Sequence, residues 1–230
     1  MVKLENWSVT YPDGTEAVKG LSLTLKAGER VALIGANGAG KSSLLLSLVG
    51  ILPATGYLEV DGTVLTKENL TKIRNQVGVV FQNPDDQLFL PTIYDDIAFG
   101  PRNQGLDEET VKHRVEDRLA LLGISHLKER TALKLSGGEK RMAALATVLA
   151  MKPSFMVLDE PTAFLDPRAR RNLMAVLKAL PHTQLIATHD LAFATELCPR
   201  SIILRQGQLF ADGKTAELLP DAALMAAADL

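Results

Sequence analysis

The sequence is poor in cysteine, with a single residue of that type, Cys198, among 230. No disulfide can therefore form within the chain, and this composition fits a reducing compartment. Cys198 follows Leu197 and precedes Pro199. We expect it to be a packing residue rather than a catalytic thiol.

Long apolar runs are also missing. The longest, residues 143–151, is interrupted by Thr147 and is too short to span a bilayer. Residues 1–4 show no apolar signal core. We therefore expect a soluble protein that meets a membrane only through a partner.

Neither sign of charge is in large excess, because 25 basic and 27 acidic residues leave a formal net charge of -2. Proteins that bind nucleic acid usually carry a basic excess, so we expect no nucleic-acid partner. The hydrophobic content of 47% and the charged content of 23% are ordinary for a globular chain. We expect residues 1–230 to form one domain with a sizeable core.

The order of apolar segments predicts an α/β fold with a largely parallel sheet. Residues 31–35, 155–158 and 185–188 are short apolar runs typical of buried strands. A helix is expected over residues 41–49. Residues 201–211, with Gln206-Gly207 at their centre, predict a hairpin.

Helical signals dominate residues 83–150, which we expect to form a helical subdomain inserted between two parts of the α/β core. Asp107 is a good N-cap, and apolar residues then recur at helical spacing until Gly123 ends the helix. Residues 218–230 are rich in alanine and leucine and predict one further short helix.

A glycine-rich segment, residues 35–42, connects the first apolar strand to the following helix and fits the P-loop pattern. Its glycines let backbone N–H groups turn toward phosphates, where the helix N-terminus adds partial positive charge. Lys41 would reach the β- and γ-phosphates, and Ser42 would bind Mg2+. The alternative is a glycine-rich turn without a ligand. The candidate nucleotide-binding residues of this segment are Gly35, Asn37, Gly38, Ala39, Gly40, Lys41, Ser42 and Ser43.

Two acidic residues, Asp159 and Glu160, directly follow the apolar run at 155–158. Asp159 would hold Mg2+ through its water shell, and Glu160 would orient and deprotonate the attacking water. The alternative is a polar strand end without a catalytic role. His189 ends another apolar run, so it points at the same crevice and could hydrogen-bond the γ-phosphate. We expect surface positions for the remaining histidines, His113, His126 and His182.

Residues Leu135-Ser-Gly-Gly-Glu139, here called the signature segment, precede another expected helix. A capping box would explain Ser136 and Glu139. It does not explain Gly137 and Gly138, which cost chain entropy and would let a phosphate approach a second helix N-terminus. Because the P-loop already has its own lysine and metal ligand, the signature segment would close over the nucleotide of a partner chain.

The P-loop, the signature segment and the strand that ends in Asp159 and Glu160 together resemble the nucleotide-binding domain of ABC ATPases. The resemblance covers essentially the whole chain. It implies a P-loop NTPase core, hydrolysis of ATP with Mg2+, and a head-to-tail dimer with two ATP molecules at the interface. Both a homodimer and a heterodimer with a paralogue are possible.

By that resemblance, Tyr11 would stack on the adenine, and Gln82 would contact Mg2+ or water and sense the membrane partner. Asp166 would be the D-loop aspartate and His189 the switch histidine. The signature residues that would contact the ATP of the opposite subunit are Ser136, Gly137, Gly138 and Glu139. Local structure offers alternatives, since Tyr11 could cover the turn that follows it and Asp166, before Pro167, is a natural N-cap.

A narrower resemblance covers residues 80–89 and 92–101. They are similar to the ATPases of energy-coupling factor importers, which take up vitamins, cobalt or nickel. In that family the region forms the groove that receives the transmembrane coupling subunit, which works with a substrate-binding membrane component. The resemblance implies a motor subunit at the cytoplasmic face of the membrane, with its partner docked near Gln82 to Pro101.

Two residues depart from the family pattern. Phe164 stands where the D-loop usually has a small residue, so the dimer contacts expected there are in question, and Met142 replaces an arginine after the signature. Three other functions are weighed against the importer motor: a motor of another ABC transporter type, a soluble ABC protein acting on ribosomes or DNA, and a P-loop kinase. The soluble proteins usually carry two cassettes or coiled-coil insertions, and a kinase would not need the signature segment.

Overall fold

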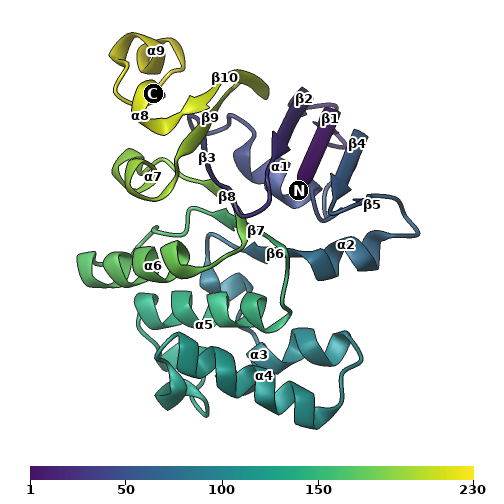
Figure 1. The fold of residues 1–230 in the computed structure, drawn as a ribbon, viewed down its shortest axis with the longest axis vertical. Helices are drawn as coiled ribbons and strands as arrows, with labels where there is room; N and C mark the ends of the chain where they lie inside the picture. The colour runs from purple at the N-terminus through teal and green to yellow at the C-terminus, as the bar shows by residue number, and fades with distance from the viewer.

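The computed structural model describes residues 1–230 and contains two β-sheets, one running through the middle of the molecule and one at its upper right in Figure 1. The smaller sheet is antiparallel, with strand order β2-β1-β4-β5. Its strands are β1 Val2–Thr10, β2 Glu16–Leu25, β4 Ala54–Val60 and β5 Thr63–Val64. The larger sheet has the order β10-β9-β3-β8-β7-β6 and is parallel except for β10. Its strands are β3 Arg30–Ile34, β6 Val77–Val80, β7 Phe155–Asp159, β8 Thr183–Ala187, β9 Arg200–Arg205 and β10 Gln208–Lys214.

The six-stranded sheet lies between two apolar cores, which explains why its central strands are continuous apolar runs. In β3, Val31 and Leu33 face a core shared with the antiparallel sheet and with α1 (Lys41–Ser47). Ala32 and Ile34 face a second core, shared with the helices on the other side. The predicted α/β fold, its parallel sheet and the hairpin of β9 and β10 are therefore confirmed.

Three helices pack together at the far end of the molecule from the antiparallel sheet (Figure 1). They are α3 Ile93–Asn103, α4 Glu108–Leu121 and α5 Gly137–Ala150. As predicted, the Asp107 side chain caps α4 by accepting from the N–H of Thr110, and Gly123 follows its end with a φ of 68°. The remaining helices along this part of the chain are α2 Leu70–Gln76, α6 Pro167–Ala179 and α7 Leu191–Leu197, with 3-10 turns at Pro84–Asp86, Ser125–Leu127 and Ala132–Lys134.

The C-terminal residues form two helices, and the short helix predicted within residues 218–230 is the second of them. They are α8 Thr215–Leu218 and α9 Ala222–Ala227. Pro220 lies between them and has no N–H to continue a helix, while Asp221 caps α9 by accepting from two backbone N–H groups. None of the helices in the molecule is long and apolar enough to cross a bilayer.

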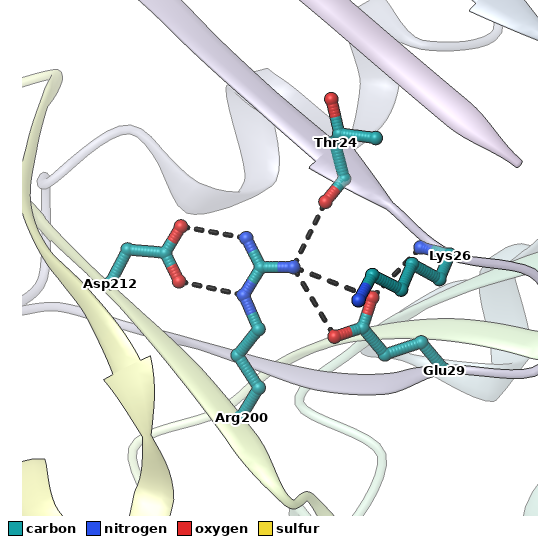
Figure 2. Close-up of polar contacts among 5 residues, drawn as sticks. All are labelled: Thr24, Lys26, Glu29, Arg200 and Asp212. Atoms are coloured by element: carbon teal, nitrogen blue, oxygen red, sulfur yellow. Dashed lines mark hydrogen bonds and ion pairs between the residues drawn. The ribbon is translucent and has the colours of Figure 1, made fainter.

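Arg200, the first residue of β9, connects the two sheets (Figure 2). Its Nε and Nη2 donate to the carboxylate of Asp212 on β10, at 2.7 and 2.6 Å. Its Nη1 donates to the carbonyl oxygen of Thr24 on β2 at 2.9 Å and to Oε1 of Glu29 at 3.2 Å. Glu29 also accepts from the backbone N–H of Lys26, which closes the turn between β2 and β3. The hydrogen bonds with Asp212 raise the pKa of Arg200 above its ordinary value.

Replacing Arg200 by methionine should lower the free energy of unfolding by about 2 kcal/mol, because two carboxylates and a backbone carbonyl lose their donor. Urea unfolding measures this change. Lys178→Met is the control, since it breaks only the exposed ion pair with Glu196 and should cost less than about 0.5 kcal/mol. Equal losses in the two variants would contradict a joining role for Arg200.

Candidate nucleotide-binding site

The loop between β3 and α1 packs directly on β2. Gly40, the N-cap of α1, has a φ of 101°, and a Cβ at this position would collide with the carbonyl oxygen of Ala17. Only glycine fits there. Gly38 also has a left-handed conformation, with a φ of 82°. The P-loop residues thus fold closely around the start of α1, as their sequence predicts.

Lys41 is buried at the start of α1. Its Nζ donates to the carbonyl oxygens of Gly35 at 2.6 Å and Ala36 at 3.1 Å. Burial lowers the pKa of Lys41, while the carboxylates of Glu160 and Asp159 act in the opposite direction. The loop therefore holds a cation close to the two acidic residues that follow β7.

Asp159 is the last residue of β7, and one of its carboxylate oxygens has no hydrogen-bond partner. Its Oδ1 is buried and forms no hydrogen bond. Burial, and then the charge of Glu160, raise the pKa of Asp159, whereas the Ser42 hydroxyl and the cations of Lys41 and Arg141 lower it. An unpartnered buried carboxylate oxygen beside a serine hydroxyl is a set of donors that fits Mg2+, which prefers oxygen ligands.

Glu160 and His189 lie against each other at the ends of β7 and β8. The Nδ1 of His189 is 2.9 Å from Oε1 of Glu160, and the backbone N–H of His189 donates to Oε2 at 3.3 Å. Glu160 is only 7% exposed and has a φ of 43°, and its N–H donates to the carbonyl oxygen of Ala187. The structure thereby fixes a carboxylate at the edge of the sheet, with a histidine to orient it.

These groups line one cavity of about 490 Å³. The sequence-predicted residues at its wall come from the P-loop, the strand ends, Gln82 and Tyr11, whose hydroxyl lies 3.0 Å from Oγ of Ser43. Thr15, Glu16 and Ala17 complete the wall. They were not expected there, because β2, which begins at Glu16, was not predicted from the sequence. The full lining is Tyr11, Thr15, Glu16, Ala17, Asn37, Gly38, Gly40, Lys41, Ser42, Ser43, Gln82, Asp159, Glu160 and His189. Gly35 and Ala39 are buried within the loop itself.

The signature segment does not reach this cavity. Ser136 and Glu139 form a capping box on α5, with the Ser136 N–H donating to Glu139 at 2.8 Å. Asp166 caps α6 by accepting from two backbone N–H groups. Ser136, Gly138, Glu139 and Asp166 line a separate hollow of about 730 Å³. The P-loop cavity and the hollow beside the signature segment are therefore separate in one chain. Such a separation is what we expect if a partner chain supplies the signature.

Three residues that the sequence analysis discussed lie outside the nucleotide cavity. Phe164, in the D-loop, is 89% exposed and has a φ of 62°, an uncommon conformation for a bulky residue. Met142 is buried in the core that α5 shares with the other helices. His182 is half-buried with its Nδ1 unpaired, and burial lowers its pKa, so the prediction of a surface position is wrong. His113 and His126 are exposed as predicted.

An apolar groove of about 470 Å³ is lined by residues of β6, α3 and α5 and by Phe81, which precedes Gln82 of the cavity described above. Phe89 and Phe99 are 64% and 45% exposed there, with their ring centroids 5.5 Å apart in an edge-to-face arrangement. Asp96 is buried in the groove wall, and its Oδ1 accepts from the N–H groups of Phe89 and Leu90, which fixes the turn before α3. Part of the groove wall, including Phe81, Phe89 and Phe99, comes from residues 80–101, where a partner was predicted to dock. The rest comes from residues 49–51, 74–79 and 147–151.

The model of the ABC transporter family matches residues 18–163. The chain belongs to this family. The energy-coupling factor transporter ATP-binding protein EcfA of Methanothermobacter thermautotrophicus is 47% identical over 236 residues, which cover 100% of this chain and 76% of EcfA. The P-loop ABC ATPase fold predicted from the sequence is confirmed, and the protein is an ATP hydrolase whose activity is coupled to transport.

Two solved structures of ABC cassettes resemble this one closely. The structure of cbiO1 from Clostridium perfringens, described as part of the ABC transporter complex cbiONQ, has a TM-score of 0.86 at 36% identity and covers 98% of this chain and 93% of its own. The ATP-binding cassette MJ0796, solved as a dimer in a post-hydrolysis state bound to ADP and Pi, has a TM-score of 0.82 at 29% identity. The match covers 94% of this chain and 99% of that cassette.

The two signature glycines differ in the space around them, which yields a testable contrast. A Cβ on Gly138 would lie 2.8 Å from Cβ of Ala169 on α6, whereas a Cβ on Gly137 would meet nothing closer than 3.6 Å. Gly138→Ala should therefore lower the free energy of unfolding by about 1–2 kcal/mol by overpacking α5 against α6. Gly137→Ala should be close to neutral. Urea unfolding of both variants measures this difference. Equal stability of the two variants would contradict the prediction and show that α5 and α6 can move apart at little cost.

Proposed function

We propose that this ABC ATPase is the motor subunit of an importer of the energy-coupling factor type, at the cytoplasmic face of a membrane. The observation that carries this proposal is the apolar groove around the exposed Phe89 and Phe99. Gln82 lines the cavity and Phe81, its chain neighbour, lines the groove, so a change at the nucleotide reaches the groove through one peptide bond. The relatedness to EcfA and to cbiO1 supports the same importer type.

ATP binds in the cavity with its phosphates on the P-loop. Lys41 and the N–H groups at the start of α1 bind the β- and γ-phosphates, and Tyr11 stacks on the adenine. Ser42, Gln82 and Asp159 would hold Mg2+, for which the unpartnered Oδ1 of Asp159 is suited. The ion, when bound, neutralises charge on the phosphate oxygens.

Glu160 acts as the general base for hydrolysis. It takes a proton from water as the water oxygen bonds to the γ-phosphorus and the bond from that phosphorus to the bridging oxygen breaks, which yields ADP and phosphate. His189 keeps the Glu160 carboxylate oriented through its Nδ1. The burial of Glu160 keeps its carboxylate away from bulk water and close to the reacting groups.

A second chain completes each nucleotide site. Because the signature segment lies outside its own chain's cavity, a head-to-tail dimer would place Ser136, Gly137, Gly138 and Glu139 of one subunit against the ATP of the other. Asp166, which precedes α6, lies at the same surface. The partner is a second copy or a paralogue, and the dimer of MJ0796 is a precedent in this family.

The membrane partners are a transmembrane coupling subunit, docked near Gln82 to Pro101, and a substrate-binding membrane component. We propose uptake of a vitamin, or of cobalt or nickel, with residues 83–150 acting as a helical subdomain that carries the signature and one part of the groove wall. A different type of ABC transporter would use the same ATP chemistry and a different partner in the groove.

Glu160→Gln should bind ATP with nearly unchanged affinity and lower the turnover number by at least about 100-fold, because the general base is lost. Steady-state phosphate release and binding of a fluorescent ATP analogue measure the two quantities. Glu16→Gln is a matched control, since Glu16 lines the same cavity without a histidine partner and should keep near-normal turnover. Normal turnover in Glu160→Gln would remove the residue from its role.

The double variant Phe89→Ser, Phe99→Ser should lose membrane partners, because it removes the exposed apolar surface of the groove. The variants are made in tagged Glu160→Gln protein, which serves with Mg-ATP as bait in detergent-solubilised membranes of the native host. Mass spectrometry then identifies the proteins that each bait captures. Phe210→Ser is the control and should retain the partners, because Phe210 is an exposed phenylalanine on β10, outside the groove.

The identity of the captured proteins tests the importer type directly. A multi-helix coupling subunit together with a small integral binding protein supports the energy-coupling factor assignment, and the ligand of the binding protein names the substrate. Capture of exporter domains, or of soluble proteins alone, would contradict the assignment. Equal capture by both groove and control variants would contradict the docking site.

A further inference from the structure

A buried cation joins the signature helix α5 to the segment that carries Gln82. Arg141, on α5, is 1% exposed. Its Nη1 donates to the carbonyl oxygen of Phe81 at 2.6 Å, and its Nη2 donates to that of Gln82 at 2.7 Å. One planar guanidinium therefore holds two consecutive carbonyls just beyond the end of β6, next to the nucleotide cavity.

The cost of burying this cation indicates that its position matters. Arg141 forms no ion pair, its Nε has no partner, and Asp159 is the acidic group that acts on it from nearby. Burial lowers the pKa of Arg141 to about 10, so the guanidinium remains charged at neutral pH. A buried charge without a direct counter-ion is unfavourable unless other polar groups compensate for it. The two carbonyls provide that compensation only while they stay in place.

Neighbouring contacts attach the rest of the same segment to the same helix. The Gln87 side chain accepts from the N–H of Phe81 and donates to the carbonyl oxygen of Ala144 and to Oγ1 of Thr147, at 2.8 and 2.7 Å. Lys140 forms an ion pair with Asp85 at 2.6 Å. Residues 81–87 are thus fixed to α5 at both ends.

We propose that Arg141 is a positioning residue that makes the Gln82 backbone and the signature helix move as one unit. α5 begins at Gly137, directly after Ser136, so Arg141 lies about one turn from the signature glycines. A displacement of Gln82 toward a bound γ-phosphate carries the signature of the same chain with it. This inference rests on the role proposed above for Gln82.

A double-mutant cycle in ATP turnover tests the proposal, using the full-length protein with Mg-ATP at a temperature well below unfolding. Arg141→Met and Gln82→Ala should each lower the turnover number by about 100-fold, since misplacement by about 1 Å has effects of that size. If Arg141 acts through Gln82, the double variant should be no more than about 3-fold below the worse single variant. Independent effects would multiply to about 10,000-fold.

Two further variants separate positioning from general stability. Arg141→Lys keeps the charge and can reach one carbonyl, so it should recover about one-tenth or more of normal turnover and can replace Arg141→Met in the cycle if the latter does not fold. Arg114→Met removes another arginine that binds a backbone carbonyl of α5, that of Ala150 at 3.1 Å, far along the helix from the signature. It should lower the unfolding temperature while leaving turnover within about 2-fold.

The outcomes distinguish this inference from the proposed function. Multiplicative losses, or normal turnover in Arg141→Met, would overturn the positioning role of Arg141. Normal turnover in Gln82→Ala would instead contradict the role proposed for Gln82 itself. A loss of turnover in Arg114→Met equal to that in Arg141→Met would attribute both effects to stability alone.

Discussion

The parallel register of β3, β8 and β7 is the constraint on which the nucleotide site depends. Leu33 pairs with Ala187, and Ala187 pairs with Asp159, so three strands end at the same level. Their next residues form the P-loop, the acidic pair and the turn to His189 at one edge of the sheet. A shift by one residue would turn the side chains of a strand to the opposite face and bury Asp159 in an apolar core. The packing of the two apolar cores therefore determines the strand register, and the register determines where the site residues lie.

Features that depend on neighbours in the chain could be predicted from the sequence. The apolar runs of β3, β7 and β8, the P-loop between β3 and α1, and the capping residues Asp107 and Ser136 are local signals, and the structure places them as expected. The antiparallel sheet escaped prediction. In β1 the alternation of buried and exposed residues breaks at Asn6, where φ is 48° and the pairing register shifts between Leu4 and Trp7.

The contacts that sequence reasoning missed join residues far apart in the chain. Thr15 to Ala17 reach the nucleotide cavity only because the P-loop packs on β2. Arg141 stands in an apolar helix, and nothing in its surrounding sequence indicates that it binds the carbonyls of Phe81 and Gln82. Polar contacts between residues far apart in the chain can be identified only once the fold is known.

The strand order also has a consequence for how the protein is made. β3, which leads into the P-loop, has hydrogen-bonded neighbours only in β8 and β9, and both come from residues beyond Thr183. While the ribosome is still adding the helices α3 to α6, the emerging β3 has no strand to pair with and its apolar residues need protection. Asp159 and Glu160 are added only after α5, and His189 only after β8, so the nucleotide site is incomplete throughout this stage. Most of the chain must therefore leave the exit tunnel before the complete ATP-binding site can form.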